Sequence, residues 1–487
     1  MSRSPYSGIY VQDFWRVHPS VTLNLGLRYD RWHAKSFKNG AGGSFDLKLG
    51  KAVAGEENGK VNLNSQPVAK YLAPATADLW VPASQAGMDG GLFKPDGYFS
   101  PRLGATWRPF GKNDFVVRGG YGMFMSSFRG NHTASSIVGL PFWTIEAQAY
   151  SSLTLQSWDT AWPQNPRDFV LPSVSEAPAY DAGATANHEW NLSIQKGLPF
   201  KSAITVSYLG ARIYDQITLN PHNEVAPGRY PNLQAAKPWP RFGDVSLLEN
   251  IGNSWYNGLQ LKFERRFTEG LSYTLSYSFA KHIQEKTPAS DWGRPAPFAP
   301  EGYHRGRSEF DRTHILAINT VYELPFGKGR KYMSSPHPVT NAILGGWQLT
   351  GIYYFTSGYP LSFSVPGATL GNGWGTRPNL VGNHKVSDPT TALWFNPAAF
   401  AAPPQYAWGN SGIGLVDGPG SHTLDAGLMK NFYFNEQRYI QFRWEMFNAP
   451  NHVNYGNPVT TFGLATTGKI FGAGSARQMQ AGLKFIF

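Results

Sequence analysis

The chain has 487 residues and no cysteine, with 43 Lys and Arg against 32 Asp and Glu and an aromatic content of 15%. The absence of cysteine excludes a disulfide scaffold and a cysteine-ligated metal site. The 53 Gly and 36 Pro together stay below the roughly 25–30% that marks low-complexity chains, and no run approaches the ~18 consecutive apolar residues of a transmembrane helix.

The net charge of +11 raises the question of nucleic-acid binding. A nucleic-acid-binding protein gathers Lys and Arg on one face or in one run, whereas here they are scattered. The densest groups are Lys328, Arg330 and Lys331 in a Pro/Gly turn, and Arg265-Arg266 at a predicted strand end. We predict no nucleic-acid partner and interpret these charges as solvated. Contact with anionic lipid head groups or glycolipid phosphate stays open.

The first residues carry no secretory signal. Such a signal places ~7–15 apolar residues after a short basic region. Here Met1-Ser2-Arg3 leads into a stretch without an apolar core, and Tyr10 to Trp15 already alternate like a strand. Either the protein is cytoplasmic or the chain begins partway into a longer exported one.

Apolar residues alternate with polar residues or glycine in many segments, which places successive side chains on opposite faces of a sheet. In one segment Val21, Leu23, Leu25, Leu27 and Tyr29 are the apolar members. Each segment is near the ~9–11 residues that a tilted strand needs to cross a bilayer. The pattern predicts about thirteen strands, near residues 8–18, 20–32, 98–108, 114–126, 187–198, 201–214, 254–267, 270–283, 311–323, 346–357, 422–434, 437–449 and 475–487.

The connections between these segments alternate in length. Short turns lie at His18–Ser20, Pro109–Asn113, Leu198–Phe200, Thr268-Glu269 and Asn435-Glu436, with a longer one from Leu324 to Gly345 in the same series. Long irregular stretches lie near 33–97, 127–186, 215–253, 284–310, 358–421 and 450–474. Compact soluble domains favour shorter connections, whereas outer-membrane barrels have short periplasmic turns and long extracellular loops. We expect all long stretches at one rim, the extracellular one, and the turns at the other.

The predicted fold class is therefore all-β, an antiparallel transmembrane β-barrel. Polar strand residues such as Arg28, Asp30, Arg443 and Glu445 suit the wet interior of a wide barrel. Aromatic residues at strand ends, such as Phe14-Trp15, suit an interfacial girdle. A two-layer soluble β protein explains the alternation equally well, but it does not explain the loop lengths or the aromatic enrichment.

No motif points to an enzyme. His188-Glu189 opens a zinc-protease pattern, but Leu192 stands where the second histidine would be. The glycine-rich stretches at 371–375 and 412–420 lack the strand and helix that flank a phosphate loop. We predict no catalytic residue, no metal site and no cofactor.

Eight tryptophans fall in the long connections, often beside Pro or Gly. Sugars and other amphipathic ligands stack on such rings, which makes these residues candidate ligand contacts. For any one of them, packing of the loops into small cores is the better explanation. They are Trp143, Trp158, Trp162, Trp239, Trp292, Trp374, Trp394 and Trp408.

Several segments resemble the barrel of TonB-dependent outer-membrane receptors: Tyr10 to Asp13 followed by Val21 to Asp30, Phe99 to Trp107, and Val117 to Gly122. Asp311 to His314 through Tyr322 to Gly327 resembles the Oar-like subgroup, which carries an N-terminal carboxypeptidase-regulatory-like domain. The resemblance runs from about residue 8 to the end. It implies a barrel of about 22 strands closed by a plug, and uptake of scarce, large nutrients with energy relayed by TonB, which grips a box before the plug.

This sequence shows no plug, TonB box or signal peptide, so we expect residues 1–487 to be the C-terminal portion of such a barrel. The expected partners are outer-membrane lipid and lipopolysaccharide, the barrel assembly machinery, an unidentified nutrient, and TonB through the N-terminal region only. The alternatives are a passive outer-membrane porin and a soluble, aromatic-rich carbohydrate-binding or hydrolytic β protein.

The direction of the strands also favours an incomplete unit. Both ends of a bacterial barrel lie in the periplasm, so its strand number is even. Counting back from a last strand that descends into the periplasm makes strand 8–18 another descending strand. Its N-terminus would lie outside the cell, which an exported chain should not allow.

The last strand matches an outer-membrane assembly signal. Gln480, Gly482, Phe485 and Phe487 follow the pattern of a polar residue, a glycine two positions on, and aromatics three and five after the glycine. The assembly machinery captures such a strand by edge pairing, and glycine allows close approach of a partner backbone. Alternation should place Leu483, Phe485 and Phe487 on one face.

Overall fold

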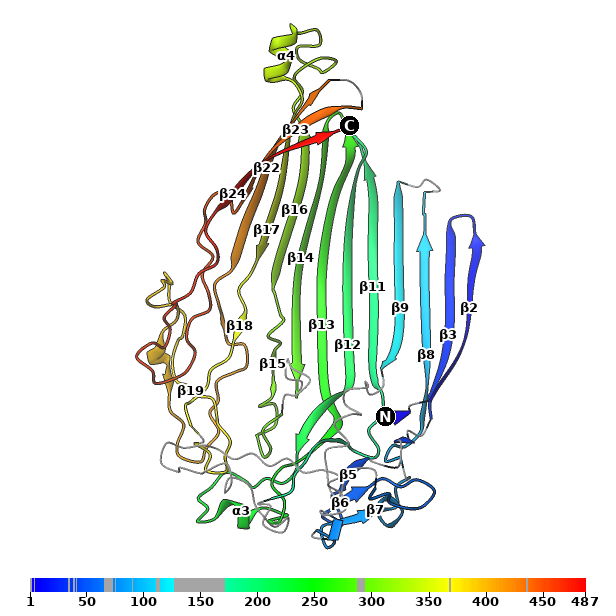
Figure 1. The fold of residues 1–487 in the computed structure, drawn as a ribbon, viewed down its shortest axis with the longest axis vertical. Helices are drawn as coiled ribbons and strands as arrows, with labels where there is room; N and C mark the ends of the chain where they lie inside the picture. The colour runs from blue at the N-terminus through cyan, green and yellow to red at the C-terminus, as the bar shows by residue number, and fades with distance from the viewer. Residues whose placement is uncertain are drawn as a thin grey trace.

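The computed structural model of the chain describes residues 2–3, 5–33, 36–37, 40, 42–64, 73–74, 76–89, 91–110, 114–126, 171–286, 294–367, 369–434 and 437–487. The largest unit among them is one twisted sheet, shown in Figure 1 with its strands side by side in chain order. In this part of the chain no helix is long and apolar enough to cross a membrane.

Thirteen strands among the described residues form the path of this main sheet, each antiparallel to the one before it. They are β2 (Tyr6–His18), β3 (Val21–Trp32), β8 (Asp96–Trp107), β9 (Phe115–Ser126), β11 (Thr185–Leu198), β12 (Ser202–Pro221), β13 (Val245–Thr268), β14 (Leu271–Glu285), β16 (His314–Glu323), β17 (Trp347–Thr356), β22 (Ser421–Tyr433), β23 (Tyr439–Phe447) and β24 (Gln478–Ile486). The predicted strands and the all-β fold class are confirmed.

The boundaries of β12 and β13 differ from the prediction, because both strands continue past the expected ends at 214 and 254. A register shift occurs at Gln216, after which Ile217 pairs with Asn250 and Leu219 with Leu248. Beyond the shift β10 (Val174–Pro178) adds to β13 in parallel. Leu219 and Leu248 are buried there, so packing outside the regular sheet extends these two strands.

Short turns and long connections lie at opposite ends of the main sheet (Figure 1). One tight turn joins β13 to β14, where Glu269 and Gly270 have φ of 52° and 80°; two positive values suit a two-residue hairpin that follows the strand twist. The connection with α4 (Pro338–Leu344) lies at the same end. The predicted separation of turns and loops is confirmed for the described residues, while residues 111–113, 127–170 and 435–436 lie outside them.

The long connections form a loop layer with short elements that the sequence did not predict. Those on the first half are β5 (Gly43–Asp46), β6 (Lys51–Ala54), β7 (Trp80–Pro82), η2 (Ala83–Ala86) and α3 (Leu233–Ala236). Those on the second half are β15 (Arg305–Arg307), β18 (Pro360–Leu361), β19 (Asn379–Leu380), η4 (Pro397–Ala399), β20 (Phe400–Ala401) and β21 (Val416–Asp417). Near the N-terminus β1 (Ser2–Arg3) pairs with β4 (Ser36–Phe37).

The two faces of the main sheet differ in polarity. Leu192, Tyr208, Leu259 and Phe279 are neighbours in register across four strands, and each is between 41% and 51% exposed. One residue along, Ser193, Ser207, Gln260 and Ser278 form the corresponding row on the other face. An apolar face of this extent is unfavourable in water and matches the lipid-facing side of a membrane barrel.

Candidate functional site

The polar face of the main sheet is the first candidate surface for contact with a solute. Near its N-terminal edge Arg28 Nε donates to Asp30 Oδ1 at 2.7 Å, and the Tyr6 hydroxyl contacts both side chains. The three side chains hydrogen-bond one another on the polar face of the main sheet. Such a face can line an aqueous or plugged lumen.

A hollow of about 460 Å³ lies on this face across β3, β8, β9 and β11. The Arg102 guanidinium lies 4.7 Å from the centre of the Phe124 ring, and Arg118 Nη1 donates to Gln195 Oε1 at 2.9 Å. Neither guanidinium has an ion pair with a carboxylate among the described residues, and Glu189 is the one carboxylate in the lining. The net charge of the lining is therefore positive, which suits anionic groups. Glycines on the polar face keep it open, because their positions carry no side chain: Gly104, Gly120 and Gly122.

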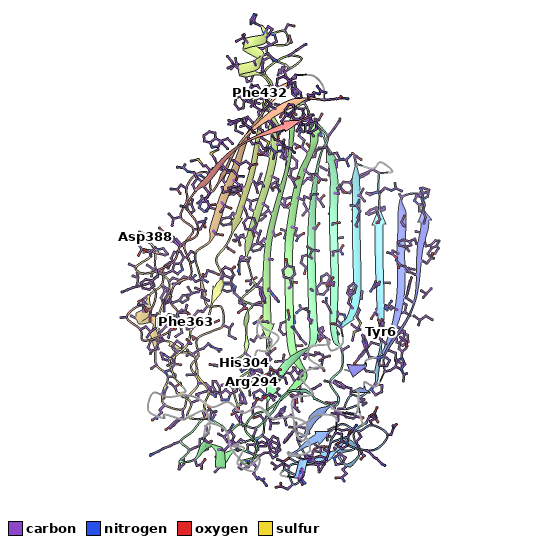
Figure 2. All side chains as sticks on the ribbon, in the orientation of Figure 1. Tyr6, Arg294, His304, Phe363, Asp388 and Phe432 are labelled. Carbon is purple, nitrogen blue, oxygen red and sulfur yellow. The ribbon has the colours of Figure 1, made fainter. Side chains whose placement is uncertain are left out.

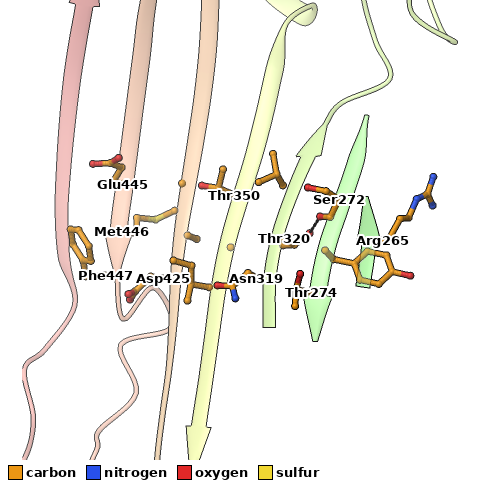
Figure 3. Close-up of a pocket in the computed structure, with 16 residues that line it drawn as sticks. Arg265, Ser272, Thr274, Asn319, Thr320, Thr350, Asp425, Glu445, Met446 and Phe447 are labelled. Carbon is orange, nitrogen blue, oxygen red and sulfur yellow. Dashed lines mark hydrogen bonds between the residues drawn. The ribbon is translucent and has the colours of Figure 1, made fainter. Parts of the chain in front are cut away.

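A second hollow of about 420 Å³ spans β13, β14, β16, β17, β22 and β23 (Figure 3). Glu445 Oε2 accepts a hydrogen bond from Gln480 Nε2 at 2.5 Å, and Asp425 Oδ1 accepts one from the Asn448 amide at 2.9 Å. Arg265 lies at the opposite edge of the hollow from these carboxylates. The inner wall therefore carries two guanidinium groups beside one carboxylate near one edge of the sheet, and Asp425 and Glu445 beside Arg443 near the other.

Two apolar cores built around aromatic rings lie in the described part of the loop layer. In the first, the ring of Phe45 lies 4.8 Å from that of Trp239 and 5.1 Å from that of Phe242. In the second, the ring of Phe363 lies 5.0 Å from that of Phe395 and 4.1 Å from that of Phe400. Residues far apart in sequence are thus held together at the loop end by ordinary burial.

A direct contact joins the segments that carry these cores. Asn372 Nδ2 donates to the Val225 carbonyl at 2.8 Å, and the Gly228 amide donates to the Leu370 carbonyl at 2.9 Å. Gly371 has a φ of +74°, and a Cβ there would lie 2.0 Å from the Gly228 carbonyl oxygen. Only glycine fits this position, both for its backbone conformation and for the space available.

Charged side chains from two loops and a tryptophan from a third meet beside this contact. Arg294 Nη2 donates to Asp244 Oδ1 at 2.5 Å and lies 3.9 Å from Glu224 Oε1. Its guanidinium carbon is 5.7 Å from the centre of the Trp374 ring. Figure 2 places Arg294 and His304 at the loop end of the main sheet. The charges of this cluster compensate one another, so none is left free for a ligand. We therefore interpret the cluster as a cross-link between loops.

Arg307 forms a second cross-link. It donates from Nε to Asp311 Oδ2 at 2.8 Å and from Nη1 to Asp417 Oδ1 at 2.6 Å, and the Asp311 side chain is 1% exposed. Burial opposes the charge of Arg307, but these hydrogen bonds outweigh it and raise the pKa of Arg307. Nearby, burial lowers the pKa of His304, whose ring nitrogen lies 3.0 Å from the Ala296 carbonyl.

Four of the candidate tryptophans lie in the described residues, and all four are half-buried. Trp239 packs on the first core, while Trp394 packs on the second and donates from Nε1 to the Asp417 carbonyl at 2.8 Å. Trp408 contacts Tyr303 at 4.8 Å between ring centres, and Trp374 lies under Arg294. The four tryptophans thus lie at separate positions, and each packs against other loop residues. Trp143, Trp158, Trp162 and Trp292 lie outside the described residues.

The terminal strand has the predicted alternation. Leu483 and Phe485 of β24 pair with Phe442 and Ile440 on the apolar face, and Phe487 is 90% exposed. Gln480 and Gly482 lie on the polar face, opposite Glu445 and Arg443. A Cβ at Gly482 would meet nothing within 4 Å. Within the described residues this strand pairs with β23 alone.

A family model described as an outer membrane beta barrel domain matches residues 1–480. The chain belongs to this family. As an outer membrane beta barrel domain it has the outer-membrane location that the sequence predicted, and the soluble alternative is set aside. No curated protein matches the chain.

Solved structures similar to this outer membrane beta barrel domain include the FrpB iron transporter from Neisseria meningitidis, with 12% identity and a TM-score of 0.45 over 98% of this chain and 44% of that one. The outer membrane transporter YddB from Escherichia coli has 10% identity and a TM-score of 0.46, with 99% and 45% covered. The ferripyoverdine receptor of Pseudomonas aeruginosa has 8% identity and a TM-score of 0.44, with 98% and 38% covered. The chain spans less than half the length of each.

Sequence reasoning missed the cross-linking arginines of this barrel domain. Arg294 and Arg377 lie in irregular loops and Arg307 ends the three-residue strand β15, so no periodicity marks any of them. Arg377, whose guanidinium carbon lies 3.6 Å from the centre of the Tyr303 ring, also donates to the Tyr303 and Ser411 carbonyls. The clearest available signal was an arginine in a long loop rich in Gly and aromatics, the setting in which cation–π contacts form.

Proposed function

We propose that this outer membrane beta barrel domain is the barrel portion of a TonB-dependent receptor, which takes up a scarce, large nutrient without covalent catalysis. One observation carries the proposal: a wide antiparallel sheet with an apolar outer face, a polar inner face and a packed loop layer at one end. The segments that resemble TonB-dependent receptors, including the Oar-like stretch from Asp311 to Gly327, agree with it.

The two edge strands of the main sheet indicate how many strands the whole barrel contains. Within the described residues β2 and β24 end the sheet and do not pair with each other. Unpaired backbone groups in lipid cost several kcal/mol each, so the proposal includes further strands of the same gene product between these edges. Barrels of about 22 strands enclose a plugged lumen, which suits uptake of a large solute.

The proposed ligand contacts lie in the loop layer and on the polar inner face. The tryptophans of the loops and the cationic hollow around Arg102 and Arg118 are the candidate positions. The TonB contact and the plug belong to the N-terminal region in this proposal. The barrel assembly machinery would read Gln480, Gly482, Phe485 and Phe487.

A conductance measurement on the full-length gene product tests the proposal against a passive porin. A receptor closed by a plug should show no steady conductance in a planar bilayer, whereas a porin should conduct continuously. Reading the coding sequence upstream of Met1 provides the matching genetic test, since it should encode a plug and a TonB box. Steady conductance from a gene product without a plug region would contradict the receptor and favour the porin.

A further inference from the structure

The connection between β16 and β17, residues 324–346, differs from the other turns at its end of the main sheet. It extends beyond the strand ends and carries α4 (Figure 1). Its sequence contains Lys328, Arg330 and Lys331 and no Asp or Glu. We call this segment the basic turn. A connection that only reverses the chain needs about two to five residues, so its length calls for another explanation.

The basic turn exposes apolar side chains. None of the residues of α4 is buried, and Val339 and Ile343 are one helical turn apart on the same side of it. The exposed apolar side chains, with the exposed fraction of each, are Phe326 40%, Tyr332 49%, Val339 61%, Ile343 60% and Leu344 47%. Such a concentration is unfavourable in water and marks a surface that meets a partner or a membrane.

The end of the basic turn is fixed on the lipid-facing side of the main sheet. Trp347 Nε1 donates to the Ile343 carbonyl at 2.8 Å, and Lys430 Nζ donates to the Ile343 and Gly345 carbonyls at 3.0 and 2.6 Å. Trp347 and Lys430 pair in register, and they share their face with Leu349 and Leu428. The turn is therefore continuous with the apolar outer face.

Aromatic side chains mark this level as the membrane interface. Phe432 lies at the same end of the main sheet (Figure 2), followed by the exposed rings of Tyr433 and Phe434. Aromatic girdles sit at the depth of the lipid head groups. The basic turn, which starts and ends at this depth, is in position to contact head groups.

Two cations of the basic turn form no ion pair with any residue that the structure describes. Arg330 pairs with Glu323 at 2.7 Å. Lys328 and Lys331 are exposed and have no ion pair among the described residues, and the Lys331 ammonium lies 5.4 Å from the centre of the Tyr332 ring. Apolar side chains beside unpaired lysines are the composition of an interfacial segment that binds anionic lipid.

We propose that the basic turn binds anionic phospholipid head groups of the leaflet on the short-turn side, with Lys328 and Lys331 contacting phosphate and Val339, Ile343 and Leu344 dipping into the acyl boundary. The proposal is independent of TonB and of the nutrient. Each lysine near an anionic surface contributes on the order of fivefold in affinity. The contact weakens with salt, because exposed charges are screened.

A dye on the basic turn tests the proposal. Because the chain has no cysteine, the exposed Ser335→Cys gives a single labelling site for an environment-sensitive fluorophore. The full-length gene product, with serine in place of any cysteine outside residues 1–487, is placed in nanodiscs of phosphatidylcholine alone or mixed with phosphatidylglycerol. We expect a blue shift on adding phosphatidylglycerol, reversed by salt. The same dye at Ser387→Cys, in the loop layer, should not respond.

Lysine variants test whether the positive charge of the basic turn is needed for lipid binding. Lys328→Gln with Lys331→Gln should abolish the response to phosphatidylglycerol, whereas the control pair Lys48→Gln with Lys385→Gln, exposed in the loop layer, should retain it. Native mass spectrometry from detergent should show the same loss of retained phosphatidylglycerol. Equal emission in both lipid mixtures, or a full response in the Lys328/Lys331 double variant, would overturn the proposal and leave the apolar face for a protein partner.

Discussion

In the loop layer, Phe242 and Phe395 are each 1% exposed, whereas Leu192 and Leu259 of the main sheet are about half exposed. The loops bury their apolar side chains against one another, as a soluble domain does. The strands present theirs outward in rows, which only lipid can cover. The apolar side chains of this chain therefore face either the interior of the loop layer or lipid. The effect of a substitution should depend on which of these two environments its side chain faces.

The largest effect should come from the terminal strand, where the sheet depends on assembly into the membrane. Deleting Phe487 from the full-length gene product should remove most of it from the outer membrane without reducing synthesis, because, in our proposal, the assembly machinery recognises the aromatic end of β24. Surface labelling and fractionation measure this. Phe110→Ala, which removes an exposed ring in the turn after β8 and away from β24, is the matched control. Unchanged surface levels after the deletion would refute the signal.

The next effect should be confined to the loop layer. Phe395→Ala removes a buried ring that contacts Phe363 and Phe400, which should cost about 3–5 kcal/mol in the local stability of the second core. Hydrogen exchange of residues 395–401 measures this. Phe298→Ala, at a loop ring that is 56% exposed, should change stability by less than about 0.5 kcal/mol. Loss of protection throughout the main sheet would show that the two regions are not separate.

Substitutions at two neighbouring residues of β13 test the difference between the two faces of the main sheet directly. Leu259→Arg places a cation on the lipid-facing side and should cost about 2–4 kcal/mol near the bilayer midplane. Gln260→Arg places the same side chain on the polar face, where water or a plug can accommodate it. The free energy of unfolding from lipid vesicles measures both. Equal costs at the two positions would contradict the assignment of the faces.

The smallest effect should be a pH dependence within the loop layer. Burial lowers the pKa of His304, and Arg377 and Lys286 lower it further, against the Ala296 carbonyl that raises it. The unfolded loop then binds the proton more readily, so the packing around His304 keeps its full stability above the unfolded pKa of about 6.5 and loses stability as the pH falls through the folded value.

Protection factors of the β15 amides should therefore fall between pH ~7.5 and ~5. His304→Gln keeps a donor for the Ala296 carbonyl but cannot titrate in this range, and it should flatten the profile. A profile that is unchanged in the glutamine variant would assign the effect to another group.

Strand positions in this chain were predictable because a bilayer imposes a simple rule. Leu271 to Phe279 alternate for the whole length of a span, and β14 forms over Leu271–Glu285. The extension of β13 back to Val245 could not be predicted in this way, since Leu247 and Leu248 are consecutive apolar residues that do not alternate. Their partners, β10 and the first loop core, lie far away in sequence.

Candidate site residues were less predictable than strands. The four tryptophans in the described residues lie in loops, as predicted, but nothing in the sequence indicated that Trp239 and Trp394 would lie in two different cores. The cross-links of Arg294 and Arg307 join loops separated by 50 to 110 residues. Contacts of this kind depend on which loops lie at the same end of the sheet. Local sequence patterns contain no information about that.

The sequence by itself determined which residues cross the membrane and which side of each strand faces lipid, because alternation with period two is local and every strand meets the same apolar solvent. Tertiary structure decided how the loops pack and where unpaired charge is left on the inner wall and on the basic turn. Those outcomes depend on side chains brought together by strand order and register, as Gly371 against Gly228 shows: the need for a glycine exists only once the two loops meet.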